Sequence, residues 1–313
     1  MGLLDPHDPG RGVALGSLRV SISIDPAELS LLRAPVPEWF DLERFPRMDH
    51  VSPSMTNKFS DCPESGRQRY ILNTPERPAE ALLVGSAVHL AVERNMRQKI
   101  DSHVDLPVAE LLDWYDDEGF DGHVEAEQEK SGLDAIWDSE REEAKTRGRL
   151  MLGAYHNSEA PKIQPTAVEG SFSVPMGLPV KVEGRFDILC ADRAIDLKIG
   201  KQKTTKPKAS WLIQAAIYQF ATGLPVEFHT AACSLKDHKV SIVTPIESEA
   251  LYLNMSRPEI EALQHVIRTV MYDALHYMQI YGPDTPWPTR GRFHIFACDF
   301  CSFRSNCPAW ASA

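Results

Sequence analysis

The sequence has no stretch of about 18 apolar residues, the length that a membrane-spanning helix requires. Its opening, MGLLDPHDPGRG, has neither the basic start nor the apolar segment of a secretory signal. The chain also has no internal repeat and no low-complexity tract. These absences argue against a membrane protein or a secreted one and predict a cytoplasmic location.

An excess of positive charge is missing as well, because 33 Lys and Arg stand against 44 Asp and Glu, for a net charge of -11. Proteins that coat nucleic acid by charge alone are usually basic, so this role is disfavoured. An enzyme with an acidic metal site and a local basic strip stays compatible with the balance. One such strip follows residue 198 and consists of Lys201, Lys203, Lys206 and Lys208. A solvated loop is the simpler interpretation of the strip taken alone.

What remains is an ordinary globular composition, with 43% hydrophobic and 25% charged residues in a chain of 313. That length allows two domains or one elaborated domain. Residues 1–50 are rich in proline and glycine and are expected to form an N-terminal extension, with one candidate strand (LRVSIS) and a short helix from Asp25. The main domain is expected to span residues 51–313.

Hydrophobic periodicity from Ser52 onward predicts alternating helices and strands. Helices are expected at SPSMTNKFSDCP with Ser52 or Ser54 as N-cap, PERPAEALLVGSAVHLAVERNM, PKASWLIQAAIYQFATG and about 248–281. Strands are expected at AVEGSFSV, PVKVEGRFDILC, RAIDLKIG, EFHTAACSL and KVSIVTPI. The charged region 106–158 is consistent with a peripheral helical insertion. This order predicts an α/β or α+β core with a central mixed sheet flanked by helices.

The candidate chemistry lies in two of these strands. If EGRFDILC and RAIDLKIG form a hairpin with Ala191 and Asp192 as its turn, Asp187 falls directly opposite Asp196. Opposed like charges destabilise a strand pair, so the arrangement calls for a cation or a shifted protonation state. Mg²⁺ or Mn²⁺ suits carboxylate oxygens. Lys198 projects from the same face as Asp196, where an ammonium can orient a metal-bound water.

A D-x-K triplet by itself is weak evidence, because so short a pattern recurs by chance as an ordinary same-face pair on a half-exposed strand. The surrounding motifs make a functional role of this triplet more credible. GRFD followed by IDLK resembles the motif pair of PD-(D/E)XK nucleases, and the later QAAIY resembles the Q-x-x-x-Y motif of their RecB-like branch. Upstream, GSAVH resembles the G-x-x-x-H motif of the same branch. All four motifs occur in the order that the family has.

The resemblance implies a restriction-endonuclease-like core and assigns roles to individual residues. His89, Asp187, Asp196 and the backbone carbonyl of Leu197 would hold Mg²⁺ or Mn²⁺. Lys198 would help to activate water, and Gln214 and Tyr218, spaced i to i+4, would position Lys198 or contact a phosphate. Taken singly, a histidine or a tyrosine at helical spacing is more often a core residue. Gly85, four residues before His89, is expected to permit a close approach to its helix.

The cysteines supply a separate signal. Three of the six lie in the tail as Cys298-x2-Cys301-x5-Cys307, and a distant one, Cys62, precedes the helix that carries His89. In a reducing compartment, clustered thiolates favour a metal site over disulfides, and this spacing suits zinc or an iron-sulfur cluster. Cys190 and Cys233 lie in predicted strands and are expected to be buried and inert.

The division into one cysteine and three resembles that of iron-sulfur nucleases related to the C-terminal domain of AddB and to the CRISPR-associated adaptation nucleases. That resemblance favours a structural 4Fe-4S cluster over zinc, with Cys62 and residues 298–307 as its module. It also implies a DNA exonuclease acting on single strands or ends, with the lysines from 201 to 208 drawing in the backbone. The alternatives are a structure-selective endonuclease and a noncatalytic subunit that retains the fold. Replication, repair or recombination proteins are possible partners, and the sequence does not give the oligomeric state.

Overall fold

The computed structural model describes residues 50–175, 180–244, 256–289, 298, 301–304 and 307. The predicted strand LRVSIS and the predicted helix from Asp25 lie outside these residues. None of the helices in the described part of the chain is long and apolar enough to cross a membrane.

A six-stranded mixed sheet forms the centre of the protein. Its strands are β1 (His50–Val51), β2 (Ala167–Val174), β3 (Lys181–Leu189), β4 (Ala194–Gly200), β5 (Val226–Cys233) and β6 (Val240–Val243). The order is β1-β3-β4-β5-β6, and β2 pairs with β3 off this path. The β1–β3 and β4–β5 pairs are parallel, and the other pairs are antiparallel. The predicted mixed sheet is therefore confirmed.

Strand β3 has a gap along one of its edges. One edge is paired with β2 over residues 182–189. The other edge is shared, because β1 pairs with residues 181 and 182 and β4 pairs with residues 188 and 189. Among the described strands, none pairs with residues 183–187 on that second edge. The gap leaves the carbonyl of Arg185 and the side chain of Asp187 accessible to groups other than a strand.

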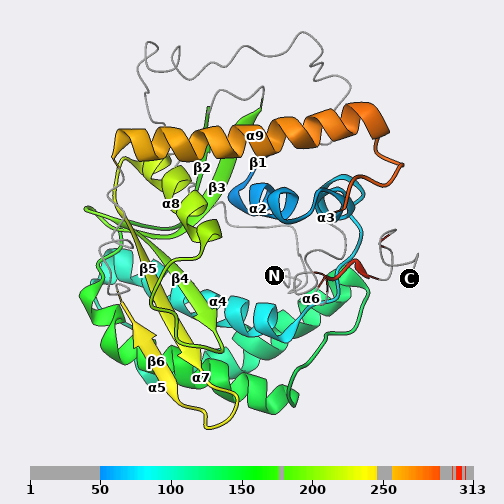
Figure 1. Cartoon of the computed structure of the whole chain (residues 1–313). Helices are drawn as coiled ribbons and strands as arrows, with labels where there is room; N and C mark the ends of the chain where they lie inside the picture. The colour runs from blue at the N-terminus through cyan, green and yellow to red at the C-terminus, as the bar shows by residue number, and fades with distance from the viewer. Residues whose placement is uncertain are drawn as a thin grey trace, which may run out of the picture.

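Helices cover both faces of the sheet, as Figure 1 shows. One layer contains α2 (Pro53–Asp61), α3 (Pro63–Gly66), the π-helix η2 (Arg67–Ile71), α8 (Ala209–Thr222) and α9 (Arg257–Tyr281). The other contains α4 (Glu80–Ser102), α5 (Val108–Trp114), the π-helix η3 (Tyr115–Gly122), α6 (His123–Ser131), α7 (Arg141–Ser158) and the 3-10 turn η4 (Ala160–Lys162). Each layer buries its own hydrophobic core, with Phe186 and Phe228 in the first and Ile195 and Leu197 in the second. The result is a three-layer α/β/α arrangement.

Most element predictions are confirmed, with shifted ends. Ser52 caps α2, because its hydroxyl accepts the N–H of Met55. Helix α4 begins at Glu80 and not at Pro75. Helix α9 begins at Arg257, where Ser256 and Glu259 form a capping box, and the predicted start near residue 248 lies outside the described residues.

The charged region 106–158 is helical as predicted, but its last helix is not peripheral. Met151, Leu152 and Tyr155 of α7 are buried against the sheet in the second core. The hydroxyl of Tyr155 lies 2.9 Å from Nδ1 of His229 on β5, and both side chains are buried. Apolar and aromatic residues at helical spacing along α7 therefore make it a component of the layer that covers β4 and β5.

Candidate active site

The predicted hairpin carries the candidate acidic residues. The N–H of Cys190 donates to the carbonyl of Arg193 at 2.8 Å, which closes the turn at Ala191 and Asp192. Pairing then continues through Leu189–Ala194 and Ile188–Ile195, where it ends. The register is the predicted one, but Asp187 and Asp196 lie just beyond the ladder and not across it. In place of a backbone partner, the Asp187 carboxylate accepts the N–H of Leu197 at 2.8 Å.

Asp196 is held by Gln214 of α8 and by Lys198 of β4. Its Oδ1 accepts Nε2 of Gln214 at 2.6 Å, and its Oδ2 lies 2.5 Å from the ammonium of Lys198. That ammonium also donates to Oε1 of Gln214 at 2.8 Å. The Gln214 amide lies 2.7 Å from the hydroxyl of Tyr218, and this hydroxyl donates to the carbonyl of Arg185 in the gap of β3. Gln214 and Tyr218, one helical turn apart, thus connect β3 to the Asp196–Lys198 pair.

His89 approaches the same point from α4. Its Nδ1 lies 3.4 Å from Oδ2 of Asp187, and its side chain is 30% exposed. Burial lowers the pKa of His89 despite the opposing effects of Asp196 and a backbone hydrogen bond with Leu197. A neutral imidazole is the form that binds metals. The close approach predicted at Gly85 is not required, because a Cβ there would lie 3.9 Å from Cβ of Ile199, an ordinary contact distance.

The two carboxylates repel each other electrostatically. Burial raises the pKa of Asp187 well above its usual range, and the charge of Asp196 raises it further. Asp196 is 2% exposed, and its Oδ2 has no hydrogen bond besides the ionic contact with Lys198. Such a pair is stable as two anions only with more positive charge than Lys198 supplies. The donor chemistry therefore fits a hard divalent cation held by Asp187, Asp196, His89 and the Leu197 carbonyl.

The described residues do not bring three His, Cys, Asp or Glu side chains together closely enough to hold a metal ion. His89 and Asp187 are adjacent, but the carboxylate of Asp196 is directed toward Lys198 and Gln214. The identity of the metal and its ligand set accordingly stay a prediction.

A third carboxylate, on Glu169, was missed by sequence reasoning. The pairs Val168–Ile188 and Gly170–Phe186 bracket Glu169 and Asp187, which places them opposite each other between β2 and β3. Burial raises the pKa of Glu169 to about 7, and the charges of Asp187 and Glu93 add to the effect. Glu169 also has a φ of 51°, which is unusual for a non-glycine residue in a strand. No two-residue turn joins β2 to β3, so the pairing argument used for Asp187 and Asp196 could not give this register.

The four lysines after β4 differ in their surroundings. Lys201 lies 3.0 Å from the buried carboxylate of Glu80 and also pairs with Asp138, so its charge is largely compensated. Lys203 and Lys206 are exposed. Lys208 is exposed too, and its ammonium lies 5.7 Å from the centre of the Trp211 ring. Their predicted contact with nucleic acid stays a prediction.

The predicted burial of Cys190 and Cys233 is confirmed, whereas the described residues do not gather three of the other four thiols at one point. Cys190 and Cys233 are buried, and burial raises the pKa of both thiols, to about 11 for Cys190. The other four are partly exposed, and no disulfide joins any of the six, all of which lie among the described residues. In the tail, N–H groups of Cys301, Arg304 and Cys307 each donate to the carbonyl three residues earlier. These turns keep the three tail thiols on a compact segment.

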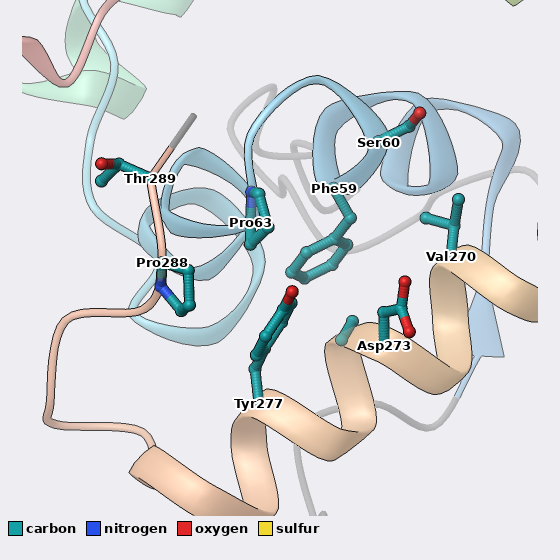
Figure 2. Close-up of a pocket in the computed structure, with 9 residues that line it drawn as sticks. Phe59, Ser60, Pro63, Val270, Asp273, Tyr277, Pro288 and Thr289 are labelled. Carbon is teal, nitrogen blue, oxygen red and sulfur yellow. The ribbon is translucent and has the colours of Figure 1, made fainter. Parts of the chain in front are cut away.

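The two ends of the main domain meet next to Cys62. Figure 2 shows a pocket of about 220 Å³ in which Phe59, Pro63 and Tyr277 face one another, with Pro288 on the wall beside Pro63. The ring of Trp287 lies 5.9 Å from that of Phe59. In the tail, the Phe303 ring lies 5.2 Å from the ammonium of Lys58, on the helix that ends just before Cys62. These contacts place the tail turn beside the helix that Cys62 terminates.

A mixed sheet covered by helices on both faces, with two acidic residues and a lysine on adjacent strands, defines a restriction-endonuclease-like nuclease. A family model described as the PD-(D/E)XK nuclease superfamily matches residues 50–308. The chain belongs to this superfamily. The match spans every motif that the resemblance used, from Cys62 to Cys307.

Two solved structures are similar to the chain. One is a candidate exonuclease from Eubacterium rectale, with 13% identity and a TM-score of 0.46, covering 78% of this chain and 86% of that one. The other is SSO0001, with 15% identity and a TM-score of 0.32, covering 70% of this chain and 97% of that one. No curated protein matches the sequence significantly.

Proposed function

We propose that the protein is a metal-dependent deoxyribonuclease that hydrolyses phosphodiester bonds, acting as an exonuclease on single strands or DNA ends. The observation that carries the proposal is the buried Asp196 carboxylate, contacted at once by Lys198 and Gln214 and set beside Asp187 and His89. A structural role alone does not account for the buried Asp196 carboxylate beside the partly buried Asp187 and His89, because removing charged groups from water costs free energy.

Individual residues would have separate roles in the proposed reaction. A bound Mg²⁺ or Mn²⁺ would supply Lewis acidity and lower the pKa of water. Asp187, Asp196, His89 and the Leu197 carbonyl would hold it. Lys198 would orient the attacking water. The support is that Gln214 holds its ammonium at 2.8 Å and that the rings of Trp211 and Phe228 lie within 5.8 Å. Tyr218 would position Gln214, whose amide lies 2.7 Å from the Tyr218 hydroxyl.

Cleavage of end-labelled, linear single-stranded DNA tests the proposal. Wild type is expected to shorten the strand with Mg²⁺ or Mn²⁺ and not in EDTA. Asp196→Ala and Lys198→Ala should each lower the rate by about 10²–10³-fold, since the first removes a proposed metal ligand and the second a cation that acts on the developing charge. Asp192→Ala, on the exposed turn of the same hairpin, is the matched control and should retain the wild-type rate.

Closed circular single-stranded DNA separates the alternatives. An exonuclease leaves the circle intact, whereas an endonuclease linearises it. Absence of cleavage of linear, circular, duplex and branched DNA by folded wild type would contradict the nuclease proposal and favour a noncatalytic subunit.

We further propose that Cys62, Cys298, Cys301 and Cys307 bind a 4Fe-4S cluster that joins the two ends of the main domain. The support is the partial exposure of these four thiols, the compact tail turns and the contact of Phe303 with Lys58. A cluster bound only by the folded chain would stabilise that state.

Metal analysis of anaerobically purified protein tests the cluster. Iron and acid-labile sulfide are expected in equal amounts, and Cys301→Ser should lose most of both, because the cluster then lacks one thiolate. Cys233→Ala, which changes a buried cysteine outside the set, should retain them. Stoichiometric zinc in place of iron would show that the site is a zinc site.

A further inference from the structure

A basic pocket lies at the carboxyl ends of β4 and β5, beyond the catalytic strand. Its volume is about 410 Å³, and one wall is the segment Lys201–Lys203 that follows β4. The other wall is the turn between β5 and β6, with Ser234, Lys236 and Lys239. Gly200 pairs with Ala232, so the two walls start from adjacent strands. Lys203 is five positions after Lys198, so their backbones lie at most about 18 Å apart.

Charge in the pocket is mostly positive and mostly uncompensated. Lys203, Lys236 and Lys239 are exposed, and none forms a direct ion pair with a carboxylate among the described residues. Lys201 differs, because Glu80 and Asp138 compensate it. Among the described residues that line the pocket, Asp237 is the one acid, and a hydrogen bond with Ser234, together with the charge of Lys239, helps to lower its pKa. In a chain with a net charge of -11, three exposed lysines without a direct ion pair around one pocket are a local exception.

The turn that presents two of these lysines has its own hydrogen bonds. The N–H of Ser234 donates to the carbonyl of Lys239 at 3.1 Å, and the hydroxyl of Ser234 accepts the N–H of Lys236 at 3.2 Å. The carboxylate of Asp237 accepts the N–H of Lys239 at 3.2 Å and so helps to stabilise the turn. These hydrogen bonds fix the backbone of the turn, so Lys236 and Lys239 are attached to a turn of defined conformation.

We propose that this pocket binds the sugar-phosphate backbone of the DNA strand that enters the active site. The inference rests on the proposed nuclease function and extends it to Lys236 and Lys239, which the sequence analysis did not select. Lysines and serine hydroxyls are suited to phosphate, and the described residues that line the pocket include no aromatic side chain to stack on a base. Binding there is therefore independent of base sequence and depends on salt.

Fluorescence anisotropy of a labelled single-stranded oligonucleotide in EDTA tests the pocket, because binding is measured without cleavage. The variant is Lys236→Gln/Lys239→Gln. Lys130→Gln/Lys162→Gln is the control, since it removes the same charge from side chains that are 74% and 66% exposed outside the pocket. Circular dichroism should show both variants folded.

At 0.1 M salt, the pocket variant is expected to bind roughly 10- to 30-fold more weakly than wild type, with a salt dependence shallower by about 1.4 in log–log slope. The control should match wild type. Unchanged affinity and slope in the pocket variant, an equal loss in the control, or no DNA binding by wild type would overturn the inference. DNA binding by wild type without metal-dependent cleavage would instead contradict only the nuclease proposal.

Discussion

Asp187→Asn is expected to remove DNA cleavage and yet to stabilise the folded protein in EDTA. Loss of one metal-binding carboxylate should cost several kcal/mol of transition-state stabilisation, or about 10³-fold in rate. The asparagine oxygen can still accept the N–H of Leu197, but the repulsion with Asp196 disappears. A gain of about 1 kcal/mol would raise Tm by roughly 2–4 °C in a chain of this size.

The stabilisation should depend on pH in a defined direction. Burial, with Asp196, raises the pKa of Asp187 in the folded state, so the folded protein holds this proton more tightly than the unfolded chain does. Wild-type stability from this group is then complete below the ordinary pKa of about 4 and falls as the pH rises above it. The advantage of Asp187→Asn over wild type should therefore be larger at pH 8 than at pH 5.

Thermal unfolding in EDTA and in Mn²⁺ supplies the measurement. Mn²⁺ should raise the Tm of wild type, since it binds the folded state, and should have much less effect on Asp187→Asn. Asp192→Asn, whose side chain is 70% exposed on the same hairpin, should behave as wild type in both solutions. A cleavage rate for Asp187→Asn within tenfold of wild type would exclude Asp187 from the metal site.

Arg67→Met is expected to lower the free energy of unfolding by about 3–5 kcal/mol, because it leaves the Glu64 carboxylate buried without its ionic partner. The two side chains are 4% and 3% exposed and form two hydrogen bonds, of 2.8 and 2.7 Å. Glu64 also accepts the N–H of Trp287 at 2.7 Å, and Arg67 donates to the carbonyl of Pro283 at 2.6 Å. The pair thus ties the helix after Cys62 to the segment that leads into the cysteine tail.

Urea unfolding of three variants checks this interpretation. Arg69→Met, with a side chain 48% exposed, is the control and should cost no more than about 1 kcal/mol. Glu64→Gln/Arg67→Met should recover part of the loss, because no uncompensated charge stays buried. Iron content should fall in Arg67→Met if the pair helps to assemble the cluster. A loss below 1 kcal/mol in Arg67→Met would show that Glu64 finds another partner.

Local geometry is what the sequence determined by itself. The two-residue turn sets the register of the β3–β4 hairpin, and alternation places Asp196 and Lys198 on one face. Helical spacing brings Gln214 and Tyr218 together on α8. These relations depend on a few neighbouring residues and on fixed backbone periods, so they can be derived without knowing how the chain folds over longer distances.

Only the tertiary structure decided which distant groups share the site. Glu169 lies near Asp187 because β2 pairs with one edge of β3. The Tyr218 hydroxyl reaches the carbonyl of Arg185 because β1 and β4 leave a gap on the other edge. Lys201 is paired with Glu80, 121 positions earlier, while the β5–β6 turn places Lys236 beside Lys203. Strand order and helix packing depend on burial summed over both cores, and no local period encodes that sum.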